Sequence, residues 1–207
     1  MNVQKPVIRK GRKFDQVIEG ARDIFLAQGF EGASVDDIAK AAGVSKATLY
    51  SYFPDKRLLF LEVAKGECLR QAEEAMELVG INCEPRVLLG IAARKMLAFF
   101  NSDLSMNVFR ICVAEAERFP ELAREFYRSG PMLARRHLCD YLTCAAERGE
   151  LRIKDVETAA DQFAELCKAR IFTERLFGIR GNFSEDEIEH IANEAVETFM
   201  ARYGRPA

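Results

Sequence analysis

The sequence has few of the residues from which enzymes and metal centres are usually built. It holds 2 His in 207 residues, and it lacks a Gly-rich phosphate loop, a His-Glu-x-x-His motif and a Gly-x-Ser-x-Gly motif. None of its 6 Cys forms a Cys-x-x-Cys pair, the spacing that is typical of zinc and dithiol sites. We therefore expect no enzymatic activity, no bound metal and no cofactor.

Long apolar runs, a secretory signal and low-complexity segments are also missing. No stretch approaches the roughly 20 apolar residues that a membrane span needs. With 6 Pro and 13 Gly, the chain does not have the composition of a disordered or collagen-like protein, and its hydrophobic content of 49% is enough to form a core. The sequence predicts a soluble, globular, cytoplasmic protein with no membrane partner.

The formal net charge of −2 conceals two segments of opposite charge. Residues 1–60 hold ten Lys and Arg against seven Asp and Glu, whereas residues 61–207 hold twenty against twenty-five. Five basic residues precede the first acid, Asp15, and form a basic arm: Lys5, Arg9, Lys10, Arg12 and Lys13. Such an arm favours contact with nucleic acid. We therefore predict two domains, 1–60 for DNA binding and 61–207 for a different task.

Apolar residues recur at helical spacing along nearly the whole chain, and no β-branched run bounded by a turn dipeptide indicates a hairpin. The breaks in this pattern fall at Gly, Pro and polar cap residues, such as Gly29, Pro54 and Ser184. We therefore predict an all-α protein with two short helices between Ser34 and Phe53. The other helices are expected over 12–28, 56–79, 85–101, 105–118, 121–129, 131–148, 156–178 and 185–203.

Residues 34–53 have the form of a helix-turn-helix, in which Gly43 turns the chain between two short capped helices. In the second of these, Leu49 and Phe53 share one face and are expected to pack inward. The opposite face is small and polar around Ala47, which suits a DNA major groove about 12 Å wide. We predict that contacts to bases and phosphates come from Arg9, Lys10, Arg12, Lys13, Ser34, Ser45, Lys46, Ala47, Thr48, Tyr50, Ser51, Tyr52 and Lys56.

This segment resembles the N-terminal domain of the TetR family of transcriptional regulators, over about 45 residues from Phe14 to Leu59. One residue departs from the pattern, since many members have Gly where this chain has Ala47. The family's hallmark Gly-x-Ser-x-x-x-Leu-Tyr-x-x-Phe-x-x-Lys is present as Gly43, Ser45, Leu49, Tyr50, Phe53 and Lys56.

The second segment is similar to the AefR-like C-terminal subgroup of that family. The likeness lies in the run from Glu115 to Ala123, followed by Phe126-Tyr127 and Gly130-Pro131. The resemblance implies a homodimeric repressor that binds a near-palindromic double-stranded operator and is released by a small-molecule effector.

The last two long helices, 156–178 and 185–203, carry apolar stripes. In the family the corresponding helices form a four-helix bundle between two subunits, so the resemblance implies a homodimer through them. The same stripes would also suit the core of a single chain.

The middle helices are rich in aromatic and sulfur-containing residues, most of which we expect in an ordinary core. A minority are predicted to line an apolar pocket for a small apolar or aromatic effector, with a few polar contacts. The candidate lining residues are Met96, Phe100, Phe109, Cys112, Phe126, His137, Tyr141 and Phe172.

Two alternatives remain from the residues alone. Cys139 and Cys144 lie five apart on one predicted helix, which leaves a redox-sensing regulator open although their spacing disfavours a direct bridge. A helical interaction module that does not bind DNA is the other, and a steep fall of DNA affinity with salt would argue against it.

Overall fold

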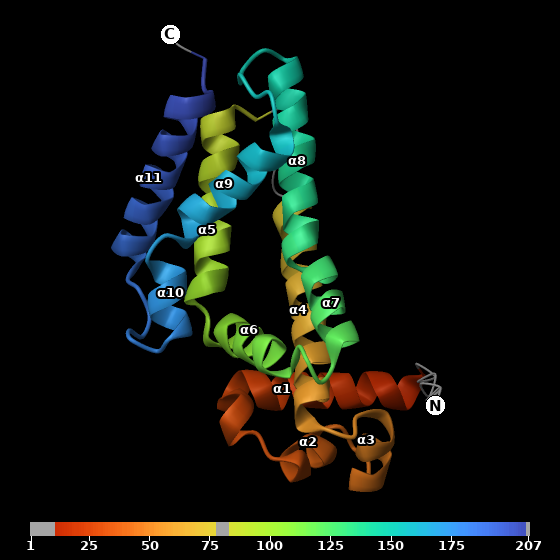
Figure 1. Cartoon of the computed structure of the whole chain (residues 1–207). Helices are drawn as coiled ribbons and strands as arrows, with labels where there is room; N and C mark the ends of the chain where they lie inside the picture. The colour runs from red at the N-terminus through yellow and green to blue at the C-terminus, as the bar shows by residue number, and fades with distance from the viewer. Residues whose placement is uncertain (1–10, 78–82, 206–207) are drawn as a thin grey trace. The chain divides into compact units, whose positions relative to one another are not determined.

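The computed structural model describes residues 11–77 and 83–205, and every regular element within these ranges is a helix (Figure 1). The all-α prediction is therefore confirmed. In the described part of the chain, extended pairing is limited to one isolated bridge between Leu151 and Gly204. No helix among these residues is both long and apolar enough to cross a membrane.

The chain divides into two compact units, Met1–Glu67 and Cys68–Ala207. The division lies seven residues beyond the domain boundary that we predict from charge and motif. It falls inside α4 (Lys56–Glu77), which continues from the first unit into the second.

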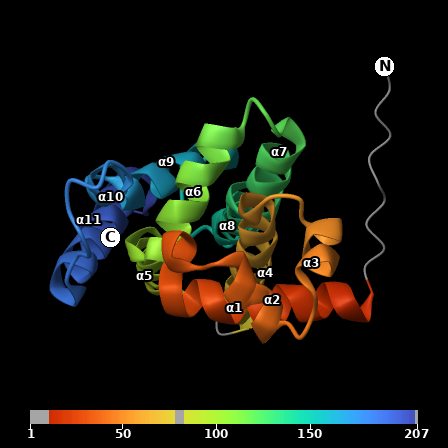
Figure 2. The same cartoon turned by 90° about the horizontal axis from the view of Figure 1, so that it is seen from below.

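The first unit consists of α1 (Arg12–Gly32), α2 (Val35–Ala41), α3 (Lys46–Tyr52) and the start of α4. Gly29 adopts a φ of 70° and ψ of 178°, so the regular helix is broken at the residue where the sequence predicts its end, and one further turn follows. α2 packs across α1, and α3 follows it after a short turn (Figure 2).

Two aromatic groups hold the first unit together. Phe14 of α1 contacts Tyr52 and Phe53 at the end of α3, with ring centroids 5.8 and 5.5 Å apart. Phe25 of α1 and Phe60 of α4 meet edge to face at 4.9 Å. Both arrangements fix the orientation of the flanking helices, because the rings are large and interlock.

The described residues of the second unit form seven further helices after α4, and these pack mainly through α5, α9 and α11. Most of the predicted bounds agree with the structure within two or three residues, and the predicted end at residue 79 lies outside the described residues. The helices are α5 (Pro85–Asn101), α6 (Asp103–Glu115), α7 (Pro120–Ser129), α8 (Pro131–Glu147), α9 (Val156–Lys168), α10 (Ile171–Leu176) and α11 (Glu185–Tyr203).

The single helix predicted over 156–178 is wrong, because the structure has two helices there, α9 and α10. Between them Arg170 adopts a φ of 64°, a left-handed conformation that is strained for a residue with a side chain. The Ile171 amide turns back to the Ala169 carbonyl at 2.8 Å. Neither Gly nor Pro stands at this break, so no turn signal marks it in the sequence.

The core of the second unit consists of the apolar stripes of α5, α8, α9 and α11. Phe163 of α9 and Phe199 of α11 are fully buried and meet edge to face at 5.3 Å. Ala160, Cys167 and Ala195 lie in the same core. The apolar stripes of α9 and α11 on which we based the dimer prediction therefore pack within a single chain.

A buried arginine ties α10 to the corner between α5 and α6. The Arg175 guanidinium donates to the Asn101 carbonyl at 3.0 Å and to Asp103 Oδ1 at 2.7 Å. In return, Arg110 of α6 donates to the backbone carbonyls of Arg175 and Leu176 at the end of α10. These reciprocal contacts fix α10 against α6.

Candidate nucleic-acid interface

Both short helices of the first unit begin at a serine whose hydroxyl accepts a backbone amide. Ser34 Oγ accepts a hydrogen bond from the Asp37 amide at 3.0 Å, and Ser45 Oγ accepts one from the Thr48 amide at 3.1 Å. Gly43, with a φ of 63°, makes the turn between the helices. The predicted caps and turn are confirmed, because each satisfies an amide that the helix itself leaves without a partner.

Helix α3 has one buried and one exposed face, as its sequence predicts. Leu49 and Phe53 are buried, at 1% and 5% exposure. The opposite face is accessible and carries most of the predicted base contacts, namely Ser45, Lys46, Ala47, Tyr50 and Ser51, with Thr48 half-buried at its margin. A small, hydroxyl-rich face of this kind allows close approach of the helix backbone to base edges.

Lys46 lies on this face but is not isolated there. Its ammonium forms an ion pair with Asp36 of α2, and both side chains are exposed. An acceptor on DNA would have to compete with this carboxylate, and Asp36 would repel a phosphate nearby. The sequence shows that Asp36 is near this motif. Its ion pair with Lys46 could not be predicted, because it depends on how the turn places α2 beside α3.

Lys56 makes contacts that differ from the predicted phosphate grip. Its ammonium donates to the carbonyls of Phe30 and Ala33 at 2.7 and 3.0 Å, and it lies 4.4 Å from the centre of the Phe30 ring. It therefore binds carbonyls at the end of α1, as a C-terminal cap does. Tyr52 is likewise half-buried against Phe14, whereas Tyr50 is 47% exposed.

The close approach between α1 and the end of α2 at Ala42 depends on Gly20, a residue that we did not predict from the sequence. A Cβ on Gly20 would lie 2.5 Å from the Ala42 amide nitrogen and 2.7 Å from its Cα. Only a residue without a side chain fits at this crossing. An isolated Gly inside an otherwise regular helical pattern was the available signal.

The basic arm is described only in part. Arg12 and Lys13 are exposed in the first turn of α1, and Arg9 and Lys10 lie outside the described residues. Gly11 precedes α1 and provides no side-chain cap. Two cations at a helix N-terminus oppose the helix dipole, and a phosphate bound there would neutralise their charge.

Three of the predicted effector-binding residues form one aromatic group in the second unit. Phe172 of α10 contacts Phe100 of α5 at 5.5 Å and Phe109 of α6 at 5.0 Å, both edge to face. Phe99 extends this group through Phe100 at 5.8 Å. Phe109 and Phe172 are only half-buried, so part of the group faces outward.

The remaining predicted lining residues are distributed over other parts of the second unit. The Tyr141 hydroxyl donates to the Cys83 carbonyl at 2.8 Å, and burial raises the pKa of Tyr141 to about 12. It is therefore a satisfied core tyrosine. Met96 packs against the core around it, Cys112 is buried on α6, and Phe126 and His137 are half-buried on α7 and α8.

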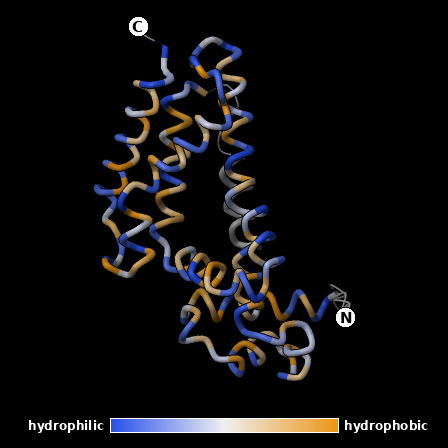
Figure 3. Tube along the Cα trace, viewed as in Figure 1, coloured by the Kyte–Doolittle hydropathy of each residue, from blue (hydrophilic) through white to orange (hydrophobic). Residues whose placement is uncertain are grey.

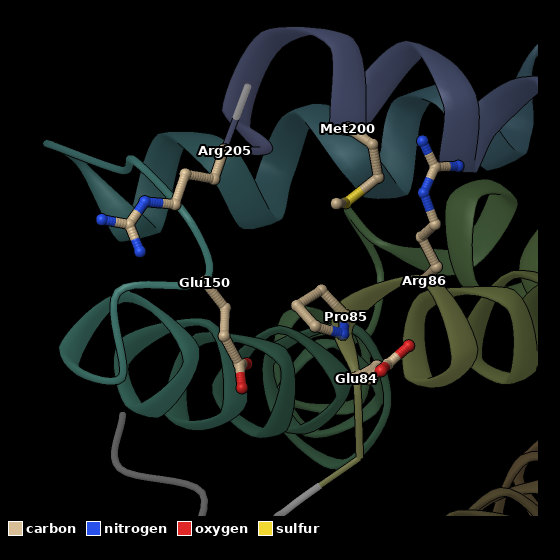
Figure 4. Close-up of a pocket in the computed structure, with 6 residues that line it drawn as sticks. All are labelled: Glu84, Pro85, Arg86, Glu150, Met200 and Arg205. Atoms are coloured by element: carbon tan, nitrogen blue, oxygen red, sulfur yellow. The ribbon is translucent and has the colours of Figure 1, made fainter. Parts of the chain in front are cut away.

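Two hollows of the second unit lie elsewhere. One, of about 320 Å³, is lined by Glu84, Pro85, Arg86, Glu150, Met200 and Arg205, and Figure 4 shows Met200 reaching into it toward Pro85. Its lining is mainly charged, which does not suit an apolar effector. The other, of about 550 Å³, lies between α9 and α11.

The described cysteines give no support to a redox switch. Cys83, Cys112, Cys139, Cys144 and Cys167 are all free thiols. Burial raises the pKa of Cys139 and that of Cys167, the latter to about 12. A raised pKa disfavours the thiolate, which is the reactive form. Among the described residues no group of His, Cys, Asp and Glu is arranged to hold a metal ion.

Known proteins match both units of the chain. The family model for bacterial regulatory proteins of the tetR family matches residues 17–63, and that for the AefR-like transcriptional repressor C-terminal domain matches residues 87–205. The HTH-type transcriptional repressor AcnR of Corynebacterium efficiens is 39% identical over 62 residues, which are 30% of this chain and 33% of AcnR. The chain thus spans about a third of the length of the curated relatives it matches.

Solved structures match over nearly the full length. A putative TetR-family regulator from Mesorhizobium loti is 27% identical, with a TM-score of 0.73 over 95% of this chain and 99% of that one. The flavonoid-responsive regulator FrrA is 36% identical, with a TM-score of 0.67 over 96% of this chain and 100% of that one. These relatives are transcriptional regulators and not enzymes. The chain belongs to the TetR family of bacterial regulatory proteins, with an AefR-like C-terminal domain.

Proposed function

We propose that this protein is a homodimeric transcriptional repressor that binds a near-palindromic operator through α3 and is released by a small aromatic effector. The observation that carries the proposal is the exposed face of α3, which is centred on Ala47 and held by the capped turn at Ser45. A face without bulky side chains at the end of a helix-turn-helix suits insertion into the major groove.

The surroundings of this face support contact with phosphates on either side. Arg12 and Lys13 at the start of α1 supply positive charge, and the Ser34 cap lies at the N-terminus of α2. Tyr50 presents an exposed hydroxyl from α3 itself. Lys46 would exchange its partner Asp36 for an acceptor on DNA. Lys56 supports the interface indirectly, by holding the end of α1.

A dimer follows from the way such helices read DNA. Two recognition helices on one face of the duplex must lie about 34–36 Å apart to enter successive major grooves. The accessible sides of α9 and α11 are the surfaces proposed for the contact between copies, in place of the buried stripes.

The effector is proposed to be planar and aromatic. The half-buried rings of Phe109 and Phe172, together with Phe100, offer edges and faces on which such a ring can stack. FrrA, a full-length relative by structure, is named flavonoid-responsive, which supports hydroxylated flavones as the first compounds to test. Release requires that the effector bind the DNA-free state more tightly than the DNA-bound state.

Fluorescence anisotropy with labelled DNA from upstream of the protein's own gene tests the proposal. We expect affinity at least ten times that for random DNA of equal length, a steep loss of affinity with salt, and release by one or more hydroxylated flavones. Ala47→Glu should abolish specific binding, because a bulky acid then stands at the centre of the α3 face. Ala134→Glu places the same residue on an exposed position of α8 and serves as the control.

Equal affinity for upstream and random DNA, or an Ala47→Glu variant that binds like the wild type, would contradict the DNA-binding proposal. Specific DNA binding that no flavone changes would leave the interface intact and remove the proposed effector class.

A further inference from the structure

An ion pair between Asp36 and Lys46 stands in solvent where the two short helices of the first unit meet. Asp36 lies in the first turn of α2, and Lys46 is the first residue of α3. The Lys46 side chain is 57% exposed and the Asp36 side chain 64%. The N-terminal residues of a recognition helix are the ones that reach base edges in a helix-turn-helix. The pair therefore stands where such contacts are made.

The other acid in the first turn of α2 is already engaged. Asp37 Oδ2 accepts a hydrogen bond from the Ser34 hydroxyl at 2.6 Å, and its amide is bonded to Ser34 Oγ. Asp36 takes no part in this cap. Its carboxylate can therefore change partner without breaking the contacts that start the helix.

The hydroxyls around the start of α3 are also engaged. Ser45 and Thr48 share a hydrogen bond between their hydroxyls at 2.9 Å, and the Ser51 hydroxyl donates to the Thr48 carbonyl at 2.6 Å. Hydrophilic and hydrophobic residues are interspersed along this unit (Figure 3), and the hydrophobic Leu49 is buried. Lys46 is thus a long polar side chain on the exposed face that can turn to DNA without loosening α3.

The carboxylate of Asp36 restricts what this part of the surface can bind. A carboxylate is only an acceptor, and the DNA backbone offers it phosphates, which repel it. The donors in the major groove are the amino groups of cytosine (N4) and adenine (N6). An acid at this position is therefore compatible with DNA binding where it meets one of these two amino groups.

We propose that Asp36 and Lys46 together recognise one G·C base pair in each half of the operator. On binding, the Lys46 ammonium donates to guanine N7 and O6, and the Asp36 carboxylate that it leaves accepts a hydrogen bond from cytosine N4. Neither charge then remains unpaired in the groove. This inference rests on the DNA binding of the proposed function and names a base pair that its interface selects.

The spacing of the groups on the DNA fits the pair. Guanine O6 and cytosine N4 share a Watson–Crick hydrogen bond and lie about 2.9 Å apart, so two contacting side chains can meet them side by side. In an A·T pair the adenine amino group lies between two acceptors, N7 and thymine O4. Lys46 would then lose its second acceptor, and one acceptor would face the Asp36 carboxylate and repel it.

Selection from a library of random DNA duplexes by the full-length protein identifies the operator and tests the proposal. We expect one G·C position in each half-site at which A·T is bound about tenfold more weakly or worse. Asp36→Ala should lose most of this preference at that position alone. Glu31→Ala removes an exposed acid of α1 and is the charge-matched control that should retain it. Thermal melting checks that both variants fold.

Two modified bases at that position test the contacts with the wild-type protein itself. N4-methylcytosine still pairs with guanine but lacks the amino hydrogen that faces the groove, and 7-deazaguanine lacks the N7 acceptor. We expect the methyl group to weaken wild-type binding about tenfold and to leave Asp36→Ala unaffected. The deaza base should weaken the wild type and leave Lys46→Met unaffected.

The outcomes separate this inference from the proposed function. A wild-type protein that selects no sequence would remove both. A wild type that selects an operator, with an Asp36→Ala variant of identical base preferences, would overturn the recognition by the pair and leave DNA binding in place. A preference that Asp36→Ala loses at an A·T position, or an operator whose affinity neither modified base changes, would overturn it as well.

Discussion

The two units place their exposed residues differently, and the difference explains how far the sequence alone could be interpreted. In the first unit, α3 buries Leu49 and leaves Ala47 and Tyr50 accessible, so the residues that the motif marks are those at the surface. In the second unit, α9 and α11 bury the apolar stripes that resemble an interface. A local motif fixes the exposure of its own residues, whereas an apolar stripe does not say which partner covers it.

The largest expected effect concerns the crossing of α1 with the turn of the first unit. Gly20→Ala places a Cβ 2.5 Å from the Ala42 amide nitrogen, and backbone cannot yield as a flexible side chain can. We expect a loss of about 3 kcal/mol or more of unfolding free energy and a matching loss of DNA binding. Urea unfolding followed by circular dichroism measures the first, and anisotropy the second.

Gly32→Ala is the matched control in the same helix. A Cβ there meets no atom closer than Gln28 Cβ at 3.5 Å, an ordinary contact. We expect stability equal to the wild type or slightly higher. If Gly20→Ala were as stable as Gly32→Ala, the close approach would not constrain the fold.

The next effect distinguishes Lys56 from Lys46, both of which we predict from the sequence to contact DNA. Lys56→Met removes two bonds to carbonyls at the end of α1 and the contact with the Phe30 ring. We expect it to cost about 1.5–3 kcal/mol, because the bonds come from a charged donor that is half-buried. A chemical denaturation curve reports this loss without DNA present. A fully stable Lys56→Met variant would contradict the capping role.

Lys46→Met should leave stability nearly unchanged and weaken operator binding instead. Its only described partner is the exposed Asp36, and such surface pairs contribute little. We expect the slope of log affinity against log salt to decrease by about 1. Lys154→Met removes one exposed charge from the second unit and is the charge-matched control. An unchanged slope would place Lys46 outside the interface.

Much of the fold could be predicted because its signals are local. Helix starts at Pro85, Pro131 and Ser184 coincide with the predicted ones, since Pro at the first position and a capping serine act within one turn. The break at Arg170 could not be predicted, because neither Gly nor Pro marks it. Its left-handed backbone is held by the packing of α10 on α5 and α6.

The candidate site shows the same limit. The caps at Ser34 and Ser45 follow from sequence, because their partners lie three residues on. The partners of Lys56 lie 26 and 23 residues away, and no pattern in the sequence indicates that distance. The Tyr141 hydroxyl likewise has a distant partner, because the Cys83 carbonyl that it bonds lies 58 residues away in the sequence.

The smallest expected effect concerns Glu187, at the start of α11 in the second unit. The Arg180 guanidinium and the Ser184 amide hold the pKa of Glu187 at about 2, below its ordinary value of 4.5. Because the folded pKa is the lower one, the contribution of Glu187 to stability is complete above about pH 4.5. It is lost as the pH falls from there toward 2.

Glu187→Gln should therefore lower the melting temperature at pH 7, and the difference from the wild type should shrink as the pH falls below 4.5. The Arg180–Glu187 ion pair is half-exposed to solvent, so we expect a small change that decreases further with added salt. Glu147→Gln removes an exposed acid at the end of α8 and is the control. If the Glu187→Gln difference stayed constant down to pH 2.5, the capping contacts would contribute through geometry alone and not through the carboxylate charge.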